Sequence, residues 1–169
     1  LPLPGGSLSY FMEQLKLLYP EQYSDLVRPN ATFAETAFIF LSRKNKLEQA
    51  ISCVKALQTW LWHTAANGAE FERLDHHSPP YFDAKAIRQH IAEFEEDDQR
   101  WEHWFTKESI QPLRLSYEDL ADDPSITLSK VLEVLGLKTS STNAIKVPLA
   151  KMADELSKEW AALYRQQLK

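Results

Sequence analysis

The chain has 169 residues, enough for one domain that buries most of its apolar surface in a single core. Hydrophobic residues make up 44% and charged residues 25%, which excludes a disordered polypeptide. The 19 Lys and Arg residues against 24 Asp and Glu residues give a net charge of -5, which excludes broad electrostatic attraction to nucleic acid or an anionic membrane. We therefore predict one globular domain over residues 1–169, in which any anion site is local.

The cysteine and histidine content limits which cellular compartment and which metal sites we expect for this protein. The single cysteine, Cys53, excludes an internal disulfide and a cysteine-based metal site. No apolar run approaches the roughly 18 residues of a membrane-spanning helix, and the first residues lack a charged segment followed by an apolar one. The five histidines do not reproduce a metal-binding spacing on one helix face: His63, His76, His77, His90 and His103. We expect a cytoplasmic protein that holds no metal.

The first predicted elements are a helix and a strand. Ser7 is suited to cap a helix whose apolar residues recur every three or four positions, and Pro20 ends it. Residues 21–36 predict a short helical turn and a loop. Residues 37–42 are apolar without alternation, which predicts a central parallel strand buried on both faces.

The next predicted element is a helix over residues 45–66 with two distinct stripes. The apolar stripe is expected to pack on the sheet and consists of Leu47, Ala50, Ile51, Val54, Leu57 and Leu61. The second stripe is small and polar, which admits a close ligand, and consists of Gln49, Ser52, Ala56, Thr59 and His63. Asn67-Gly68 is interpreted as the end of this helix, and residues 69–82 as a loop bordering an acceptor site.

The remaining residues alternate between helix and strand. Asp83 is expected to cap a long helix over 84–107, whose acidic run at 95–98 faces solvent. A short strand follows at 113–117, and Ser125 is expected to cap a helix that Gly136 ends. A closing helix is predicted over about 148–168. This order predicts an α/β layer structure.

Arg43 and Ser52 are the candidate ligand-binding pair. An always-charged guanidinium at a strand tip and a hydroxyl in the next helix suit a phosphate at the strand's carboxyl end. The competing interpretation is an ordinary charged residue ending a strand and a small residue that lets helices pack closely. The residues alone leave both open.

The segment over residues 43–62, RKNKLEQAISCVKALQTWLW, resembles the 3'-phosphate-binding segment of sulfotransferases that use 3'-phosphoadenosine 5'-phosphosulfate (PAPS). The resemblance is closest to the bacterial carbohydrate branch typified by trehalose 2-sulfotransferase. It implies a P-loop-kinase-like core, with a parallel sheet flanked by helices. It also implies that Arg43 and Ser52 contact the 3'-phosphate of PAPS, with Gln49 as a weaker candidate.

Such enzymes open with a strand, a Ser/Thr/Gly-rich phosphosulfate loop and a helix. This chain opens with Leu1-Pro2-Leu3-Pro4-Gly5-Gly6, which lacks the Lys-Ser/Thr of a phosphate-binding loop. We therefore expect a helix-rich carboxyl-terminal portion, incomplete at the amino terminus, with the catalytic residues upstream. The alternative is that only a short piece is missing.

Further site candidates follow from the same resemblance. Trp60 is a candidate platform for a sugar ring, with Thr59 and His63 beside it, although core packing of the Trp and a surface role for the His are the competing interpretations. Trp60 and Trp62 are expected on different sides of one helix. Lys151 begins Lys-Met-Ala-Asp, which resembles the family's closing helix, and is a candidate PAPS contact. The run Tyr117-Glu118-Asp119-Leu120 also matches the family and is assigned a structural role.

The resemblance implies transfer of a sulfuryl group from PAPS to a hydroxyl of a small carbohydrate acceptor, without nucleic acid or membrane as partner. A homodimer is left open. The alternative is a non-catalytic nucleotide-binding or interaction protein with a degenerate sulfotransferase fold. A third class, a nucleoside or sugar kinase relative, has no supporting motif here.

Overall fold

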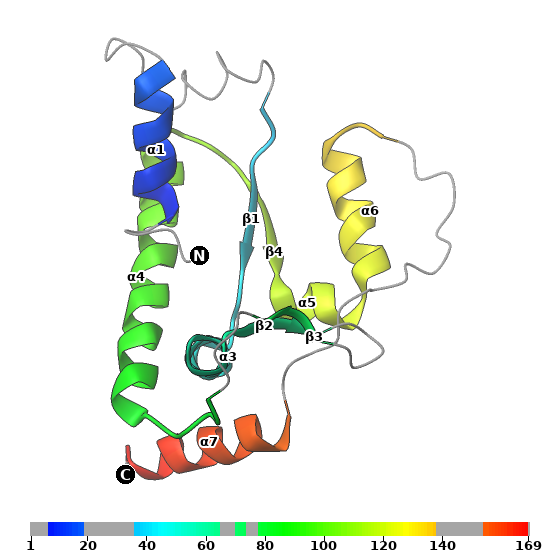
Figure 1. Ribbon diagram of the computed structural model, residues 1–169. Helices are drawn as coiled ribbons and strands as arrows, with labels where there is room; N and C mark the ends of the chain where they lie inside the picture. Colours follow the sequence, from blue (N-terminus) through cyan, green and yellow to red (C-terminus); the bar gives the residue numbers. More distant parts are fainter. Residues whose placement is uncertain (1–6, 19–35, 65–69, 74–77, 138–153, 169) are drawn as a thin grey trace. The chain divides into compact units, whose positions relative to one another are not determined.

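The computed structural model describes residues 7–18, 36–64, 70–73, 78–137 and 154–168 (Figure 1). These form two compact units, residues 1–42 with 95–140 and residues 43–94 with 141–169. The helices are α1 (Ser7–Leu18), α3 (Lys46–Thr59), α4 (Ala84–Lys107), α5 (Tyr117–Asp122), α6 (Pro124–Val134) and α7 (Glu155–Gln166). The strands are β1 (Ile39–Ser42), β2 (Leu61–Thr64), β3 (Glu70–Arg73) and β4 (Leu113–Ser116). The mixture of helices with a small parallel sheet agrees with the predicted α/β class.

The first unit is built around β1, which pairs with β4 in parallel, Ile39 opposite Leu113 and Ser42 opposite Ser116. One face of β1 packs on aromatic residues of α4. Phe38, just before β1, and Phe40 meet Trp104 and Phe105 edge-on, each pair with ring centroids 5.5 Å apart. This aromatic cluster is the core of the first unit.

The opposite face of β1 corrects one prediction. Ile39 and Leu41 are exposed rather than buried, so the strand is not covered on both faces. Successive side chains of a strand point to opposite faces, and α4 covers only the face that carries Phe38 and Phe40. The prediction made from the apolar run at residues 37–42 therefore overestimated the burial of β1.

The helix α5 was not predicted, and the cap of α6 lies two residues before the predicted one. Ser116 caps α5, because its hydroxyl accepts a hydrogen bond from the Asp119 N–H at 3.1 Å. Asp123, not Ser125, caps α6: its carboxylate accepts from the N–H groups of Ser125 and Ile126 at 2.9 and 3.0 Å. Pro124 occupies the first helical position, where its missing N–H is harmless, which places the cap on the residue before it.

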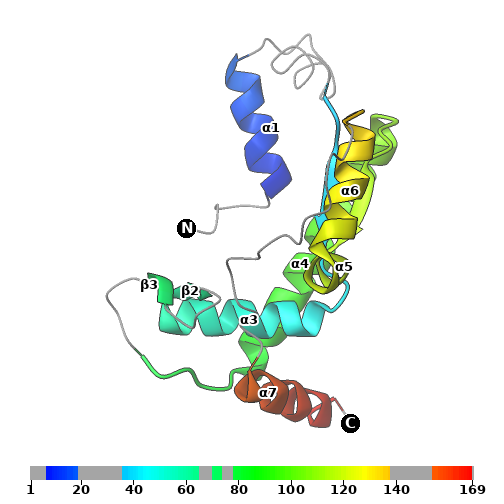
Figure 2. The same cartoon turned by 90° about the vertical axis from the view of Figure 1, so that its right-hand side faces the viewer.

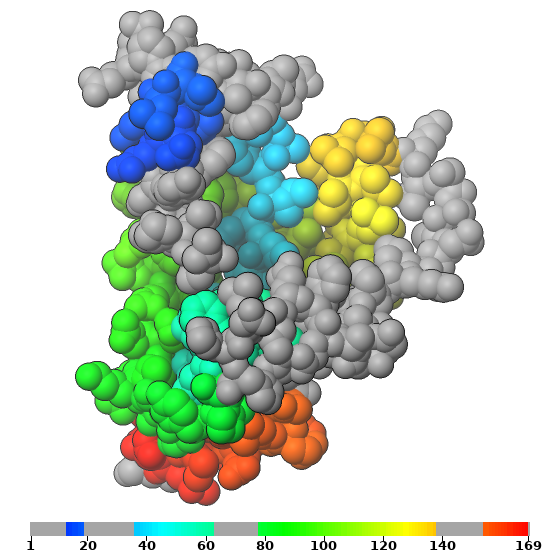
Figure 3. Space-filling model, in the orientation of Figure 1, coloured from blue at the N-terminus to red at the C-terminus, as the bar shows by residue number. Residues whose placement is uncertain are grey.

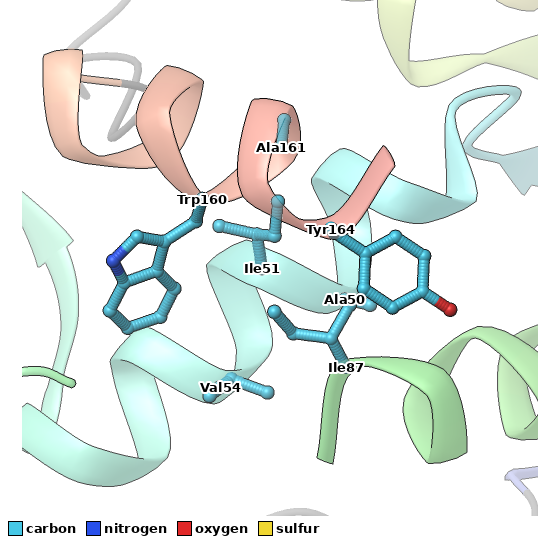
Figure 4. Close-up of a cluster of buried hydrophobic side chains, with 7 residues drawn as sticks. All are labelled: Ala50, Ile51, Val54, Ile87, Trp160, Ala161 and Tyr164. Carbon is cyan, nitrogen blue, oxygen red and sulfur yellow. The ribbon is translucent and has the colours of Figure 1, made fainter. Parts of the chain in front are cut away.

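The second unit has its own core, where α3, the start of α4 and α7 meet (Figure 4). The buried side chains are Ala50, Ile51, Val54, Ile87, Trp160, Ala161 and Tyr164. In the space-filling view, the end of α7 packs directly against the beginning of α4 (Figure 3). The limits of α4 match the prediction, and Asp83 caps it by accepting from the Ala86 N–H at 2.9 Å.

The carboxyl end of α3 lies earlier than predicted. The helix ends at Thr59, Trp60 adopts a left-handed conformation with φ 56° and ψ 19°, and β2 pairs antiparallel with β3. The predicted helix at 60–64 and the predicted loop at 70–73 are therefore wrong. The Thr59 hydroxyl stabilises this helix end, because it donates a hydrogen bond to the Lys55 carbonyl at 2.8 Å and accepts one from the Leu61 N–H at 3.3 Å. The Thr and Trp residues that follow favour extended structure.

A buried lysine joins α3 to the beginning of α7. The Lys55 ammonium lies 2.6 Å from the Asp154 carboxylate and 3.0 Å from the Ser157 hydroxyl. Partial burial of Asp154 disfavours its charge, but hydrogen bonds from Lys55 and Ser157 outweigh this and lower its pKa from 3.8 to about 2. The ion pair is therefore expected to favour the folded state at neutral pH.

This pair predicts a pH dependence of stability. Because the folded pKa of Asp154 is depressed, its contribution is present above pH ~4 and is lost as the pH falls towards ~2. The Asp154 side chain is 56% exposed, so solvent screening limits the contribution to about 1 kcal/mol. Urea unfolding across this window should show a smaller pH dependence for Lys55→Met than for the wild type. Lys158→Met is the control, because it removes an exposed ion pair within α7. If the unfolding free energy of Lys55→Met changes with pH as steeply as that of the wild type, the assignment to this ion pair is contradicted.

Candidate functional site

The candidate site begins where β1 passes into α3. The strand ends at Ser42, and Asn45 caps α3 by accepting a hydrogen bond from the Glu48 N–H at 3.1 Å. Arg43 and Lys44 therefore occupy a short turn directly before a helix amino terminus. The partial positive charge of that terminus adds to the charges of the two side chains, which favours an anion there.

The Arg43 side chain is held against the first turn of α3. Its guanidinium lies 3.7 Å from the Glu48 carboxylate and is only 18% exposed, whereas Glu48 is about half exposed. At this distance the pair is a charge interaction rather than a short bidentate contact. The exposed Glu48 carboxylate thus holds the guanidinium at the first turn of α3, and a ligand anion can replace the carboxylate there.

Ser52 lies one helical turn beyond Glu48 on α3. Residues four apart on a helix are surface neighbours, about 5 to 6 Å between Cβ atoms, so the backbone positions of Glu48 and Ser52 lie on the same side of α3. Gln49 is three residues before Ser52, and its side-chain oxygen accepts from the Lys46 ammonium at 3.4 Å. Gln49 and Ser52 therefore belong to the first two turns of α3, and Arg43 contacts Glu48 in the first turn.

The predicted acceptor-binding residues do not continue this arrangement as a helical ridge. Thr59 is the last residue of α3, and its hydroxyl bonds at the helix end. Trp60 adopts the left-handed conformation, and Trp62 and His63 belong to β2, so the prediction that Trp60 and Trp62 lie on two sides of one helix is wrong. The side chain of His63, and Lys151 altogether, lie outside the described residues.

Two features of the second unit were missed by sequence reasoning. The Glu48 contact with Arg43 was not predicted, although its position four residues before Ser52 was a usable signal. Gln58 was also missed: its side-chain oxygen accepts from the Tyr81 N–H at 2.9 Å, a contact across 23 residues that no local pattern encodes.

Outside this site, the described residues offer little further nucleophilic or metal-binding chemistry. Burial, and next the charge of Glu93, raise the pKa of the Cys53 thiol, which keeps it protonated and unreactive. Within the ranges that the structure describes, no three His, Cys, Asp or Glu side chains are grouped to hold a metal ion. None of the helices in those ranges is long and apolar enough to cross a membrane.

Comparison with known proteins identifies the family of the chain. Residues 3–167 match the family model described as Stf0 sulphotransferase. A protein of Mycolicibacterium smegmatis named trehalose 2-sulfotransferase is 29% identical over 132 residues, which cover 78% of this chain and 46% of the relative. A protein of the same name from Mycobacterium tuberculosis is 26% identical over 168 residues, covering 95% of this chain and 60% of the relative.

The chain spans about half the length of these curated relatives. The family match, in contrast, covers nearly all of the chain, including β1, α3 and the candidate site. The chain belongs to the Stf0 sulphotransferase family.

Proposed function

We propose that this chain provides the 3'-phosphate-binding part of a sulfotransferase that moves a sulfuryl group from PAPS to a carbohydrate hydroxyl. The observation that carries the proposal is the contact of the Arg43 guanidinium with Glu48 in the first turn of α3, the helix that also carries Ser52, in a member of the family. In this proposal β1, β4 and the helices beside them are part of a P-loop-kinase-like core.

A 3'-phosphate suits the groups at this site. The guanidinium can donate two parallel hydrogen bonds to phosphate oxygens, and the Ser52 hydroxyl can donate a third, which together are worth roughly 2 to 4 kcal/mol. Glu48 is exposed and lies 3.7 Å from the guanidinium, so a phosphate dianion can replace it there while the carboxylate turns to solvent. The amino terminus of α3 adds a favourable potential.

The reaction needs further catalytic groups, and we do not assign those groups to residues of this chain. In-line sulfuryl transfer needs a base on the acceptor hydroxyl and hydrogen-bond donors or cations on the departing phosphate. Neither task is attributed here to a described residue. The proposal for the chain is binding of the donor through its 3'-phosphate, and the carbohydrate acceptor is proposed from the names of the relatives.

Calorimetric titration with adenosine 3',5'-bisphosphate and with adenosine 5'-monophosphate tests the proposal. The bisphosphate should bind at least about tenfold more tightly, a difference of about 1.4 kcal/mol, because only it carries the 3'-phosphate. If a folded sample binds the two ligands equally, or binds neither, the proposal is contradicted. The non-catalytic interaction protein would then be the better description of the chain.

A further inference from the structure

Three side chains at the carboxyl end of α3 have polar or aromatic groups that the described structure does not use. They belong to Gln58, Trp60 and Tyr81, all in the second unit. Figure 2 shows this end of α3, where β2 and β3 follow. The Trp60 side chain is 38% exposed and the Tyr81 side chain 63% exposed, and neither ring makes a ring contact or hydrogen bond to another described residue. Both rings can therefore be reached from solvent.

Trp60 adopts a backbone conformation that is unfavourable for its type. Its φ of 56° and ψ of 19° lie in the left-handed region, which costs a bulky residue about 1 to 2 kcal/mol and which glycine usually occupies at helix ends. No ring contact or hydrogen bond joins the indole to another described residue, and Trp60 is 38% exposed, so neither kind of contact accounts for this cost. Residues held in such conformations are concentrated at functional sites.

Tyr81 is held rigidly although its ring is exposed. Its backbone N–H donates to the Gln58 side-chain oxygen at 2.9 Å. On its carboxyl side, Phe82 packs edge-on against Trp160 with ring centroids 6.1 Å apart. On its amino side, Pro79 and Pro80 restrict the backbone. An exposed ring on a fixed backbone can bind a ligand with little loss of conformational entropy.

Gln58 contributes a hydrogen-bond donor close in space to Tyr81 and close along the chain to Trp60. Because a backbone N–H can only donate, its partner on Gln58 is the amide oxygen, which leaves the Nε2 hydrogens directed elsewhere. No described residue accepts them. Trp60 follows Gln58 by two residues, so its Cα lies within about 7 Å of that of Gln58. One amide donor and two aromatic rings thus meet at one end of α3.

We propose that Trp60, Tyr81 and Gln58 form a subsite for a sugar ring of the acceptor. The apolar face of a pyranose packs on the aromatic rings, and its hydroxyl oxygens accept hydrogen bonds from Gln58 Nε2. This inference rests on the proposed function and adds the residues that hold the acceptor. The 14 residues of α3 span about 20 Å, so this subsite does not overlap the proposed 3'-phosphate site at the Arg43 end.

The test is ligand-observed NMR titration of trehalose into the chain, in the presence of adenosine 3',5'-bisphosphate. The variants are Trp60→Gly, Tyr81→Ala and Gln58→Leu. Glycine is chosen for Trp60 because it accepts the left-handed conformation, so this variant should be at least as stable as the wild type. Tyr81→Phe retains a ring, and Ile126→Ala removes a comparably exposed apolar side chain from α6.

We expect the wild type to bind trehalose with millimolar affinity, and Trp60→Gly and Tyr81→Ala each to weaken it about fivefold or more. Gln58→Leu should weaken it as well, while Tyr81→Phe and Ile126→Ala should stay within about twofold. Bisphosphate affinity should be unchanged in all of them.

The subsite is overturned if the wild type binds the bisphosphate but not trehalose. It is also overturned if Trp60→Gly and Tyr81→Ala bind trehalose as the wild type does, or if Trp60→Gly unfolds at a clearly lower temperature, which would make the indole a packing element. All three results leave the 3'-phosphate proposal intact. If the wild type does not bind the bisphosphate, the proposed function itself is contradicted.

Discussion

Replacing Arg43 with alanine is expected to weaken binding of adenosine 3',5'-bisphosphate by at least about tenfold and to leave binding of adenosine 5'-monophosphate almost unchanged. The guanidinium is mostly buried over the first turn of α3, so a phosphate bound there loses a charge-assisted contact that little water can replace. Isothermal titration calorimetry of both nucleotides with wild type and variant measures the difference directly.

Two further substitutions separate charge from geometry at this site. Arg43→Lys keeps the charge but not the planar pair of donors, so it should restore only part of the lost affinity. Glu48→Gln removes the carboxylate that lies 3.7 Å from the guanidinium, so bisphosphate affinity should stay equal or rise. A bisphosphate affinity that is the same in Arg43→Ala as in the wild type would show that the phosphate is bound elsewhere.

Replacing Trp160 with alanine is expected to destabilise the chain by about 3 to 5 kcal/mol. Trp160 is 3% exposed in the core of the second unit, beside Ile51 and Val54, so its removal leaves a large cavity among buried side chains (Figure 4). The edge-on contact with Phe82 is lost as well. Chemical denaturation followed by circular dichroism measures the change in unfolding free energy.

Two controls accompany this prediction. Leu163 lies on the same helix but is exposed, so Leu163→Ala should cost within about 0.5 to 1 kcal/mol. Trp160→Phe retains an aromatic ring and should be intermediate, which keeps the comparison usable if the alanine variant does not fold. Equal stability of Trp160→Ala and Leu163→Ala would contradict the packing described for α7.

Elements with a strong periodic pattern and a clear cap were predicted well from the sequence. The limits of α4 and its Asp83 cap were predicted correctly, because apolar residues recur regularly over 24 residues and an Asp precedes them. The parallel direction of β1 was also predicted, from its apolar run without alternation, and β1 pairs in parallel with β4. Local signals were sufficient in these places.

The hairpin of β2 and β3 was missed because two signals conflicted. Leu61 continues the apolar spacing of α3, which favoured a longer helix, while Thr59, Trp60 and Trp62 favour extended structure. Asn-Gly was interpreted as a helix end, although the same dipeptide is also typical of a hairpin turn between two strands. The burial of β1 was overestimated for a different reason, since composition does not reveal whether a second layer covers a face.

The candidate site was predicted in part. Gln49 and Ser52 were selected from the sequence and belong to a helix that does form, and Arg43 lies in the turn before it and contacts Glu48 of its first turn. Thr59, Trp60 and His63 were predicted on the same ridge, which the end of α3 at Thr59 interrupts. The roles of all these residues stay predictions, as does the single domain. Tyr81 could not be found because its link to Gln58 is tertiary.

A crystal structure of the chain with adenosine 3',5'-bisphosphate tests the central claim most directly. The account predicts that the Arg43 guanidinium leaves Glu48 and donates to oxygens of the 3'-phosphate at about 2.7 to 2.9 Å, with the Ser52 hydroxyl as a further donor. A nucleotide bound with its 3'-phosphate away from the first two turns of α3, and Arg43 still against Glu48, would contradict it.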